Sequence, residues 1–428
     1  MSDFTYLKRL FQAYYQEKQS EFPKVSSFNL REFGLIPWEK KVYMKRHMSF
    51  DNQDVLRSYL INEAPRHLYS SGSLYLKPDA PNMNKKEYQG CDFIIDIDVD
   101  HFYTPCKDQH DLWICKDCGA EGTGMPKICP NKKCGGSKFT KVSWVCDHCL
   151  DVAKNEITKL VFNFLIPDFG IDEKSFKIAF SGHRGYHLKV EKQEIRKLNS
   201  DERREIVDYL TGENLSFEIL GLNKKSDTIY GLLKENIGWS QKIMNKIEEI
   251  LQKPEKELEN MLLNKNSFGF NPNIVESFLN YKDDYLELVT KGERNVWAIE
   301  GFGLTNWKKL LRGIVNLIGI ELDEPVSIDI HRLIRYPGSL HGKTGFKVQE
   351  IELNELDGFN PLDESNEKLD PIVFKSKKIT QKLEIVENKL PITTIKGESF
   401  GPYIKGEKIE VPHHFAVLLL CKEVAKTI

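Results

Sequence analysis

The stretch Cys91-Asp-Phe-Ile-Ile-Asp-Ile-Asp-Val-Asp100 alternates apolar and acidic residues. Successive side chains of a strand point to opposite faces, so Phe93–Val99 is predicted to be a strand with one apolar and one acidic face. Asp96, Asp98 and Asp100 then share a face, with about 7 Å between neighbours. Carboxylates next to a buried face repel one another and favour a divalent cation. A solvated edge strand is the alternative, but aspartate is depleted in strands, so we favour metal binding.

The composition is that of a folded protein. The chain has 428 residues, of which 40% are hydrophobic and 29% are charged, enough for about two or three domains. Lys plus Arg is 61 and Asp plus Glu is 63, so a nucleic-acid contact would need a local basic patch. No apolar run reaches the ~18 residues of a membrane span, and the start lacks signal-peptide features. We therefore expect an intracellular protein without a membrane segment.

Seven of the nine cysteines fall between Cys106 and Cys149, directly after the predicted strand. An intracellular location disfavours disulfides, and zinc takes about four thiolate or imidazole ligands, so this density indicates metal binding. One complete set is Cys115, Cys118, Cys129 and Cys134. The outer set, Cys106, Cys146 and Cys149, needs a fourth ligand, for which His110 is the nearest candidate and His148 the alternative. We expect structural zinc in one or both sets; reduced cysteines in a loop are the alternative.

A second polar segment lies at a hairpin. Phe176–Phe180 and Tyr186–Val190 are predicted strands joined by the turn Ser181-Gly-His-Arg-Gly185. Glycines let the backbone approach a phosphate, and an arginine can bind one through two parallel hydrogen bonds. The alternative is an ordinary polar turn.

Two helices are predicted from apolar spacing. Phe4, Leu7, Phe11 and Tyr14 indicate an amphipathic helix over the first ~17 residues. Apolar residues from Val326 to Ile334 indicate a second helix, with Asp323 as its N-cap and Pro337 at its end.

The loop after that second helix is Gly338-Ser-Leu-His-Gly-Lys-Thr344. It resembles a phosphate-binding P-loop, but that motif needs four residues between its glycines and only three are present, so a P-loop is excluded. His341 and Lys343 remain candidates for binding a phosphate.

These three segments, in this order, resemble the small catalytic subunit of archaeal and eukaryotic DNA primase, over about residues 5–350. Asp96-Ile-Asp98 resembles the family's paired metal-binding aspartates, and Ser181–His187 its phosphate-binding segment. Arg332–Gly345 resembles its final motif, and its residues are more similar to those of the archaeal proteins. The resemblance implies that Asp323, shortly before that motif, is the third catalytic aspartate. By sequence alone Asp329 competes for this role.

The resemblance also implies the ligands. The nucleotide-binding residues would be Arg46, Ser181, Arg184, His187, His341 and Lys343. The family's one zinc site matches Cys106, His110, Cys146 and Cys149. The inner four cysteines depart from the family pattern and are expected to hold a second zinc.

The implied fold is α+β, with a primase catalytic core of mixed or antiparallel sheets, a zinc-binding insertion and a mainly helical subdomain. The expected core is 1–103 with 151–191 and 292–355. The expected insertion is 104–150 and the helical subdomain 192–291. The segment 356–428 has no family counterpart and is expected to be accessory.

The implied activity is template-directed nucleotidyl transfer, which makes short RNA or DNA primers on single-stranded DNA at the replication fork in the cytoplasm or nucleoid. Two Mg²⁺ or Mn²⁺ ions would be held by the three aspartates. Expected partners are a large primase subunit with an iron–sulfur cluster, the template, NTPs or dNTPs, and other replication proteins. This chain lacks four further cysteines for such a cluster. The alternatives are a repair or translesion polymerase of the same superfamily and a non-enzymatic zinc-ribbon protein that binds nucleic acid.

Overall fold

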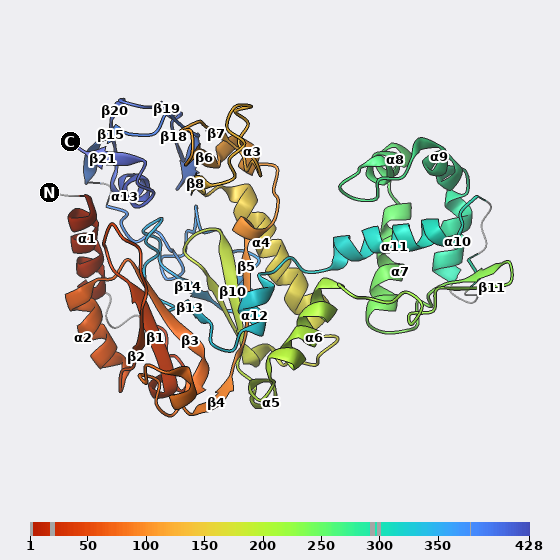
Figure 1. Ribbon diagram of the computed structural model, residues 1–428, viewed down its shortest axis with the longest axis horizontal. Helices are drawn as coiled ribbons and strands as arrows, with labels where there is room; N and C mark the ends of the chain where they lie inside the picture. The colour runs from red at the N-terminus through yellow and green to blue at the C-terminus, as the bar shows by residue number, and fades with distance from the viewer. Residues whose placement is uncertain (1–2, 18–21, 292–295, 298–300, 377) are drawn as a thin grey trace. The chain divides into compact units, whose positions relative to one another are not determined.

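The computed structural model describes residues 3–17, 22–291, 296–297, 301–376 and 378–428 (Figure 1). Contacts between residues divide the chain into two compact units, Met1–Arg204 with Leu322–Ile428, and Glu205–Glu321. Within the described ranges, none of the helices combines the length and the apolarity that crossing a membrane requires.

The first unit contains two antiparallel sheets. One has the order β13-β3-β1-β2, with β4 paired to β3. Its strands are β1 (Arg31–Ile36), β2 (Lys45–Met48), β3 (His67–Tyr75), β4 (Tyr88–Cys91) and β13 (Leu333–Arg335). The other has the order β14-β9-β10-β5. Its strands are β5 (Phe93–Asp98), β9 (Phe176–Phe180), β10 (Gly185–Val190) and β14 (Gln349–Ile351).

Helices of the first unit lie beside these two sheets or beside the smaller sheets described below (Figure 1). They are α1 (Asp3–Glu17), α2 (Gln53–Glu63), α3 (Lys107–His110), α4 (Asp147–Leu160), α5 (Gln193–Arg196), α12 (Glu324–Ile328) and α13 (His413–Cys421). Shorter turns are η1 (Phe28–Leu30), η2 (Met83–Lys85), η3 (Val99–His101), η4 (Val161–Leu165), η5 (Glu173–Ser175) and η6 (Leu353–Glu355). The predicted N-terminal helix is confirmed as α1, and its Tyr14 hydroxyl donates a 2.7 Å hydrogen bond to the carbonyl of Gly338. The first helix thus supports the last predicted motif.

The strand predicted around the aspartates is confirmed as β5. Ile95 and Ile97 are fully buried, and Asp96 and Asp98 lie on the opposite face with partial exposure. The prediction that Asp100 continues this face is wrong, because the strand ends at Asp98. Asp100 lies in the turn η3, where its backbone N–H donates a 2.9 Å hydrogen bond to Oδ1 of Asp98.

The helix predicted from Val326 to Ile334 is wrong in its second half. α12 ends at Ile328, and Leu333–Arg335 forms β13, in which Ile334 pairs with Ser70 of β3. The apolar spacing was compatible with a helix, but the backbone groups of this segment find partners in an existing sheet edge. Ile334 packs with Ile94 and Val326, so the apolar residues are buried together all the same.

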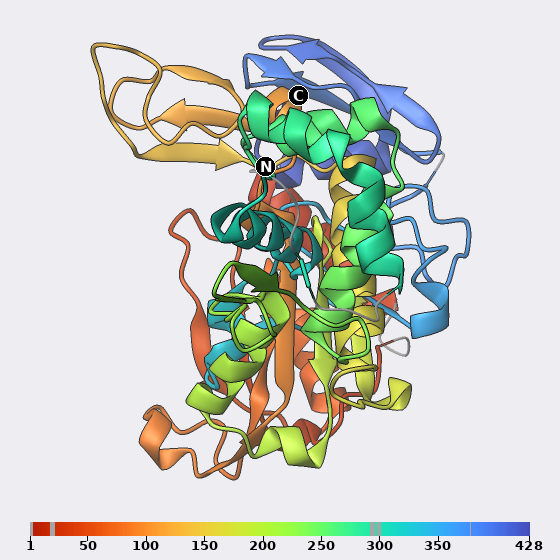
Figure 2. The ribbon, with the colours of Figure 1, turned by 90° about the vertical axis from the view of Figure 1, so that its right-hand side faces the viewer.

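The segment between β5 and α4 forms a small lobe of its own. It carries a three-stranded sheet of order β7-β6-β8, which projects from the body of its unit, in amber, in Figure 2. Its strands are β6 (Leu112–Cys115), β7 (Glu121–Thr123) and β8 (Phe139–Val142). Trp113 packs against Cys115 and Cys129, so this sheet has a core of its own.

The C-terminal segment also belongs to the first unit and contains a sheet of order β20-β15-β21. Two further two-stranded sheets, β16-β19 and β17-β18, lie in the same segment. The strands of these three sheets are β15 (Thr380–Ile385), β16 (Lys389–Leu390), β17 (Thr393–Ile395), β18 (Glu398–Phe400), β19 (Tyr403–Ile404), β20 (Lys408–Pro412) and β21 (Ala425–Thr427). The apolar run in α13 is buried, and Lys422 directly after it donates a 2.5 Å hydrogen bond to the carbonyl of Ser143. This segment therefore contacts the base of the cysteine lobe.

The second unit is mainly helical. It holds most of α6 (Ser200–Thr211), then β11 (Asn223–Lys225), β12 (Thr228–Tyr230), α7 (Trp239–Leu251), α8 (Glu255–Leu263), α9 (Pro272–Asn280), α10 (Lys282–Lys291) and α11 (Leu304–Ile318). The helical subdomain predicted at 192–291 overlaps this second unit, which runs from Glu205 to Glu321. As a result α11 lies with these helices, although its range was expected in the core. Residues 292–295 and 298–300 of the expected core lie outside the described residues.

Candidate catalytic and metal-binding sites

Three aspartates meet where β5 ends and α12 begins. The backbone N–H of Asp323 donates a 2.9 Å hydrogen bond to the carbonyl oxygen of Asp96. Asp323 occupies the N-cap position of α12, as predicted, but its carboxylate makes no capping hydrogen bond. It lies instead with Oδ2 3.5 Å from Nε2 of His101. Asp329 is used differently, because its Oδ1 accepts a 2.8 Å hydrogen bond from the N–H of His331.

The electrostatics of these carboxylates favour a cation. Burial raises the pKa of Asp96 to about 7, and the carboxylates of Asp98 and Asp323 add repulsion. Burial also raises the pKa of Asp98, with a contribution from Asp100. Oδ1 of Asp96 is buried and makes no hydrogen bond to any described residue. A buried oxygen without a donor, next to two further carboxylates, matches the oxygen ligands that Mg²⁺ and Mn²⁺ prefer.

The predicted hairpin is confirmed, and close backbone contacts place its turn against β5. β10 pairs with β5 so that Gly185 lies opposite Asp98, and a Cβ on Gly185 would lie 2.2 Å from the carbonyl oxygen of Ile97. Gly182 has a φ of +80°, and a Cβ there would lie 2.7 Å from Cβ of His341. Both glycines are therefore required for the hairpin turn to approach the catalytic strand and the 338–345 loop.

Histidines line this junction. Nε2 of His187 lies 3.4 Å from Oδ1 of Asp96, from the neighbouring strand. The rings of His183 and His341 stack, with centroids 5.2 Å apart and an interplanar angle of 2°. Burial lowers the pKa of all three histidines well below the ordinary value, so their rings are neutral. The Nε2 atom of each has no hydrogen-bond partner among the described residues.

Several residues of this junction were missed by the sequence analysis. Arg332 and Arg335 both influence the pKa of Asp96, and Nε of Arg335 is buried without a partner in the described chain. Both arginines lie inside the Arg332–Gly345 motif, and this position could have identified them from the sequence. His183 lay within the quoted turn. His67 of β3 meets the ring of His341 edge to face at 4.8 Å, a long-range contact without a local signal.

The other predicted nucleotide ligands lie in different surroundings. Lys343 is exposed beside His341. Ser181 is buried, and its Oγ accepts a 3.3 Å hydrogen bond from the N–H of His183. Arg46 bonds to the buried carboxylate of Glu32, with Nε to Oε1 at 2.9 Å.

Arg184 is fully buried, and its guanidinium is bonded to two carboxylates, Asp100 and Asp111. These contacts, with one to the carbonyl of Trp144, use all three guanidinium nitrogens within the protein.

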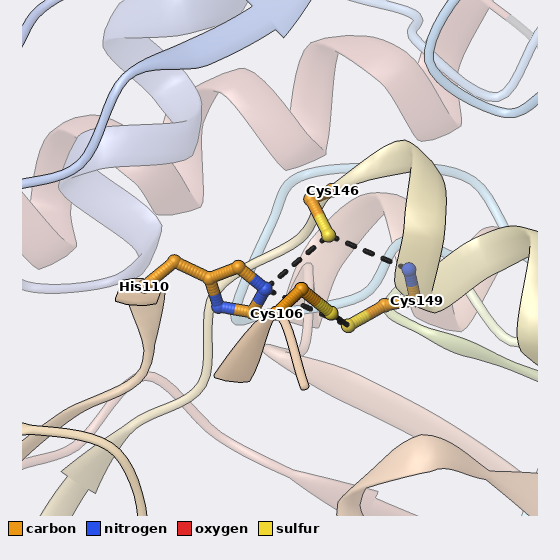
Figure 3. Close-up of side chains that lie close together, drawn as sticks. All are labelled: Cys106, His110, Cys146 and Cys149. Carbon is orange, nitrogen blue, oxygen red and sulfur yellow. Dashed lines mark hydrogen bonds between the residues drawn. The ribbon is translucent and has the colours of Figure 1, made fainter. Parts of the chain in front are cut away.

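The outer cysteines and His110 come together at the base of the lobe (Figure 3). The ligand atoms of Cys106, His110, Cys146 and Cys149 all lie within 4.8 Å of one another. Nε2 of His110 is 3.2 Å from Sγ of Cys146 and 3.6 Å from Sγ of Cys149. His148 is exposed and is not a member of the cluster. Of the two candidates for the fourth ligand, His110 is the one that the structure brings in.

The inner cysteines form a second cluster, Cys115, Cys118, Cys129 and Cys134. Sγ of Cys115 is 3.7 Å from Sγ of Cys134, and Sγ of Cys118 is 3.7 Å from Sγ of Cys129. A tetrahedral zinc with Zn–S bonds of about 2.3 Å separates its sulfurs by about 3.8 Å. The spacing of these thiols therefore fits a tetrahedral metal ion.

Comparisons with known proteins identify the family of this chain. A family model described as DNA primase small subunit matches residues 143–353. A DNA primase small subunit PriS from Methanothrix thermoacetophila is 32% identical, covering 99% of this chain and 98% of the relative. The same-named proteins of Methanocella arvoryzae and Picrophilus torridus are 30% and 33% identical, over 99% and 86% of this chain and 98% and 84% of the relatives. The family predicted from the three motifs is thus confirmed: this chain belongs to the DNA primase small-subunit family.

Proposed function

We propose that this chain is the catalytic subunit of a DNA primase, which synthesises short RNA or DNA primers on single-stranded DNA by metal-dependent nucleotidyl transfer. The observation that carries the proposal is the meeting of Asp96, Asp98 and Asp323 beside a cluster of neutral histidines. Membership of the primase small-subunit family supports it.

Asp96, Asp98 and Asp323 would hold two Mg²⁺ or Mn²⁺ ions. Bound there, such ions make a 3′-hydroxyl a better nucleophile and neutralise charge on the departing pyrophosphate. The donor set fits, because it offers carboxylate oxygens, one of them buried without a hydrogen bond to the described chain. Burial and, secondly, repulsion by Asp98 and Asp323 raise the pKa of Asp96, and bound cations would relieve that repulsion.

The histidines and Lys343 would bind the triphosphate of the incoming nucleotide. A neutral imidazole donates one N–H, and the unpartnered Nε2 atoms of His183, His187 and His341 are suited to phosphate oxygens. Lys343 would add a positive charge from the exposed side of the loop, and Arg335 a second one. Arg46 and Ser181 remain predicted nucleotide ligands by family resemblance.

Both cysteine clusters would hold structural zinc, since each supplies four protein ligands and leaves no open position for substrate. The outer ion would connect the start of α4 to the lobe, because Cys146 is the N-cap of that helix. The inner ion would stabilise the three-stranded sheet, whose core contains two of the thiols.

The expected partners follow from the proposed reaction. They are a single-stranded DNA template, nucleoside triphosphates, a large primase subunit and other proteins of the replication fork. The relatives are named as small subunits, which supports a larger companion chain.

The test is synthesis on single-stranded DNA with labelled nucleotides and Mn²⁺ or Mg²⁺, with and without a large subunit. We expect products from the unaltered chain and none from Asp96→Ala/Asp98→Ala. Products that start from two free nucleotides would identify a primase, whereas extension of existing ends alone would indicate a repair polymerase. Synthesis by the double variant would refute the assignment of the aspartates.

A further inference from the structure

Arg184 connects two parts of the first unit that the proposed mechanism treats separately. Its Nη1 and Nη2 donate to the two carboxylate oxygens of Asp111 at 2.7 and 2.8 Å. Its Nε donates to Asp100, and Nη1 also donates to the carbonyl of Trp144 at 3.0 Å. All three guanidinium nitrogens are thus used inside the protein, in a fully buried position.

One end of this arrangement reaches the outer cysteine cluster. Oδ1 of Asp111 lies 2.9 Å from Nδ1 of His110, whose other nitrogen faces Cys146 and Cys149. A carboxylate on the second nitrogen of a ligating histidine fixes the ring and its tautomer. Asp111 also accepts a 2.9 Å hydrogen bond from the N–H of Trp144, so it is held on several sides.

The other end reaches the catalytic strand. Asp100 bonds to Arg184 through its carboxylate, and its own backbone N–H donates a 2.9 Å hydrogen bond to Oδ1 of Asp98. The N–H of Val99 donates a 3.3 Å hydrogen bond to the carbonyl of Arg184, which is a second contact between Arg184 and the same turn. The orientation of the Asp98 carboxylate therefore depends on where Arg184 holds the turn η3.

The charges make this connection difficult to replace. The carboxylate of Asp111 is buried and that of Asp100 is partly exposed beside Asp98, and the guanidinium of Arg184 is bonded to both Asp111 and Asp100. Buried carboxylates are tolerated only when they are paired and hydrogen-bonded. A lysine would keep the charge but could not bond Asp111 with two parallel N–H groups while also bonding Asp100.

We propose that Arg184 is a positioning residue that couples the metal site of Cys106, His110, Cys146 and Cys149 to the catalytic aspartate Asp98, through Asp111 and Asp100. With a metal on Nε2 of His110, Asp111 is held in place, Arg184 is aligned on it, and Asp100 presents its N–H to Asp98. The inference rests on the proposed function and adds that the outer site controls the affinity of the catalytic site for divalent ions.

The test measures binding of Mn²⁺ to the full chain without nucleotide, by calorimetry or electron paramagnetic resonance, with zinc content checked. For Arg184→Lys and Asp111→Asn we expect Mn²⁺ affinity about tenfold lower and faster transfer of zinc to a chelator, in the range typical of residues that orient metal ligands. The matched control is Arg31→Lys. Arg31 is an equally buried arginine, bonded to Asp92 at 2.7 Å just before β5, and this change should leave Mn²⁺ affinity unchanged.

A second measurement separates coupling from general loosening. Removing the outer zinc from the unaltered chain should lower its Mn²⁺ affinity to that of Arg184→Lys. Removing the outer zinc from Arg184→Lys should cause no further loss of Mn²⁺ affinity. If zinc removal has the full effect in both proteins, the coupling does not pass through Arg184 and the proposal fails.

Wild-type Mn²⁺ affinity in Arg184→Lys, with only a higher KM for nucleotide, would show a phosphate ligand and overturn the proposal. If Arg184→Lys does not fold, Asp100→Asn tests the last link, because Asp100 is partly exposed and the contact to His110 is made by Asp111. It should lower Mn²⁺ affinity and leave zinc release unchanged; unchanged Mn²⁺ affinity would refute the link. Absence of Mn²⁺ binding by the unaltered chain would instead overturn the proposed metal site, and this inference with it.

Discussion

The backbone N–H of Asp323 donates a 2.9 Å hydrogen bond to the carbonyl oxygen of Asp96. This one bond joins the start of α12 to the middle of β5, two elements that are far apart in the sequence. It brings the third carboxylate next to the first pair without using any carboxylate oxygen. This contact therefore takes no potential metal ligand from the group.

Changing Asp323 to Asn should lower primer synthesis by more than about 100-fold, beyond the 10–100-fold typical of residues that only orient metal ligands. The fold should persist, since the backbone bond to Asp96 does not need the carboxylate. Thermal melting of the zinc-loaded, magnesium-free protein should show an unchanged or higher Tm, because one of several repelling carboxylates is neutralised.

The control for this change is Asp329→Asn, in the same segment. Asp329 accepts a hydrogen bond from the N–H of His331, which an amide oxygen can also accept. Its activity should stay close to that of the unaltered chain. Full activity in Asp323→Asn together with loss in Asp329→Asn would reverse the assignment of the third aspartate.

The zinc content should be two ions per chain, with different consequences of losing each. Cys118→Ser/Cys134→Ser should bind one zinc and keep the main melting transition, because the inner cluster stabilises mainly the small sheet of the lobe. Cys106→Ser/Cys149→Ser should lower Tm and activity, because the outer cluster includes the N-cap of α4 and the buried Cys149. Equal effects of both changes on melting would contradict this division.

Changing Lys343 to Ala should raise the KM for nucleotide roughly tenfold with little change in kcat, the loss expected of a charge-assisted hydrogen bond of ~1.5 kcal/mol. Mn²⁺ binding without nucleotide should be unaffected, since Lys343 is exposed and is not one of the proposed metal ligands. Lys177→Ala, an exposed lysine on β9, is the matched control. A KM equal to that of the control would remove Lys343 from the nucleotide site.

The buried ammonium of Lys422 should make stability depend on pH. Burial, with Arg184 and Lys343 nearby, lowers its pKa to about 7, against roughly 10.4 in an unfolded chain. Between these values the unfolded chain binds a proton that the folded chain does not, so the contribution of this group to stability rises with pH across that window. Below about pH 7 both states are protonated, and the contribution is at its lowest.

Lys422→Met should therefore flatten the rise of Tm measured between about pH 7 and about pH 9.5. Lys408→Met, an exposed lysine of the same segment, should leave that rise as it is. If both variants follow the pH profile of the unaltered chain, Lys422 stays protonated in the folded state.

Much of the catalytic strand and the hairpin could be predicted because their signals are local. Period-two alternation identified β5, and the glycine-containing turn between two short β-like runs identified β9 and β10. The same reasoning failed for Leu333–Arg335, where helical spacing was present but pairing with β3 decided the conformation. It failed for Asp100, because no local signal marks where a strand gives way to a turn held by Arg184.

The sequence by itself determined the family, the strand with its paired aspartates, the inner set of four cysteines and the three outer cysteines, since alternation, cysteine spacing and motif residues are properties of short segments. Only the tertiary structure decided that His110 joins the outer cysteines, that Asp323 lies beside Asp96, and that Arg184 is bonded to Asp100 and Asp111. These contacts join residues that are distant in the chain. Which of several similar side chains makes them depends on how sheets and loops pack, and local propensity does not encode that.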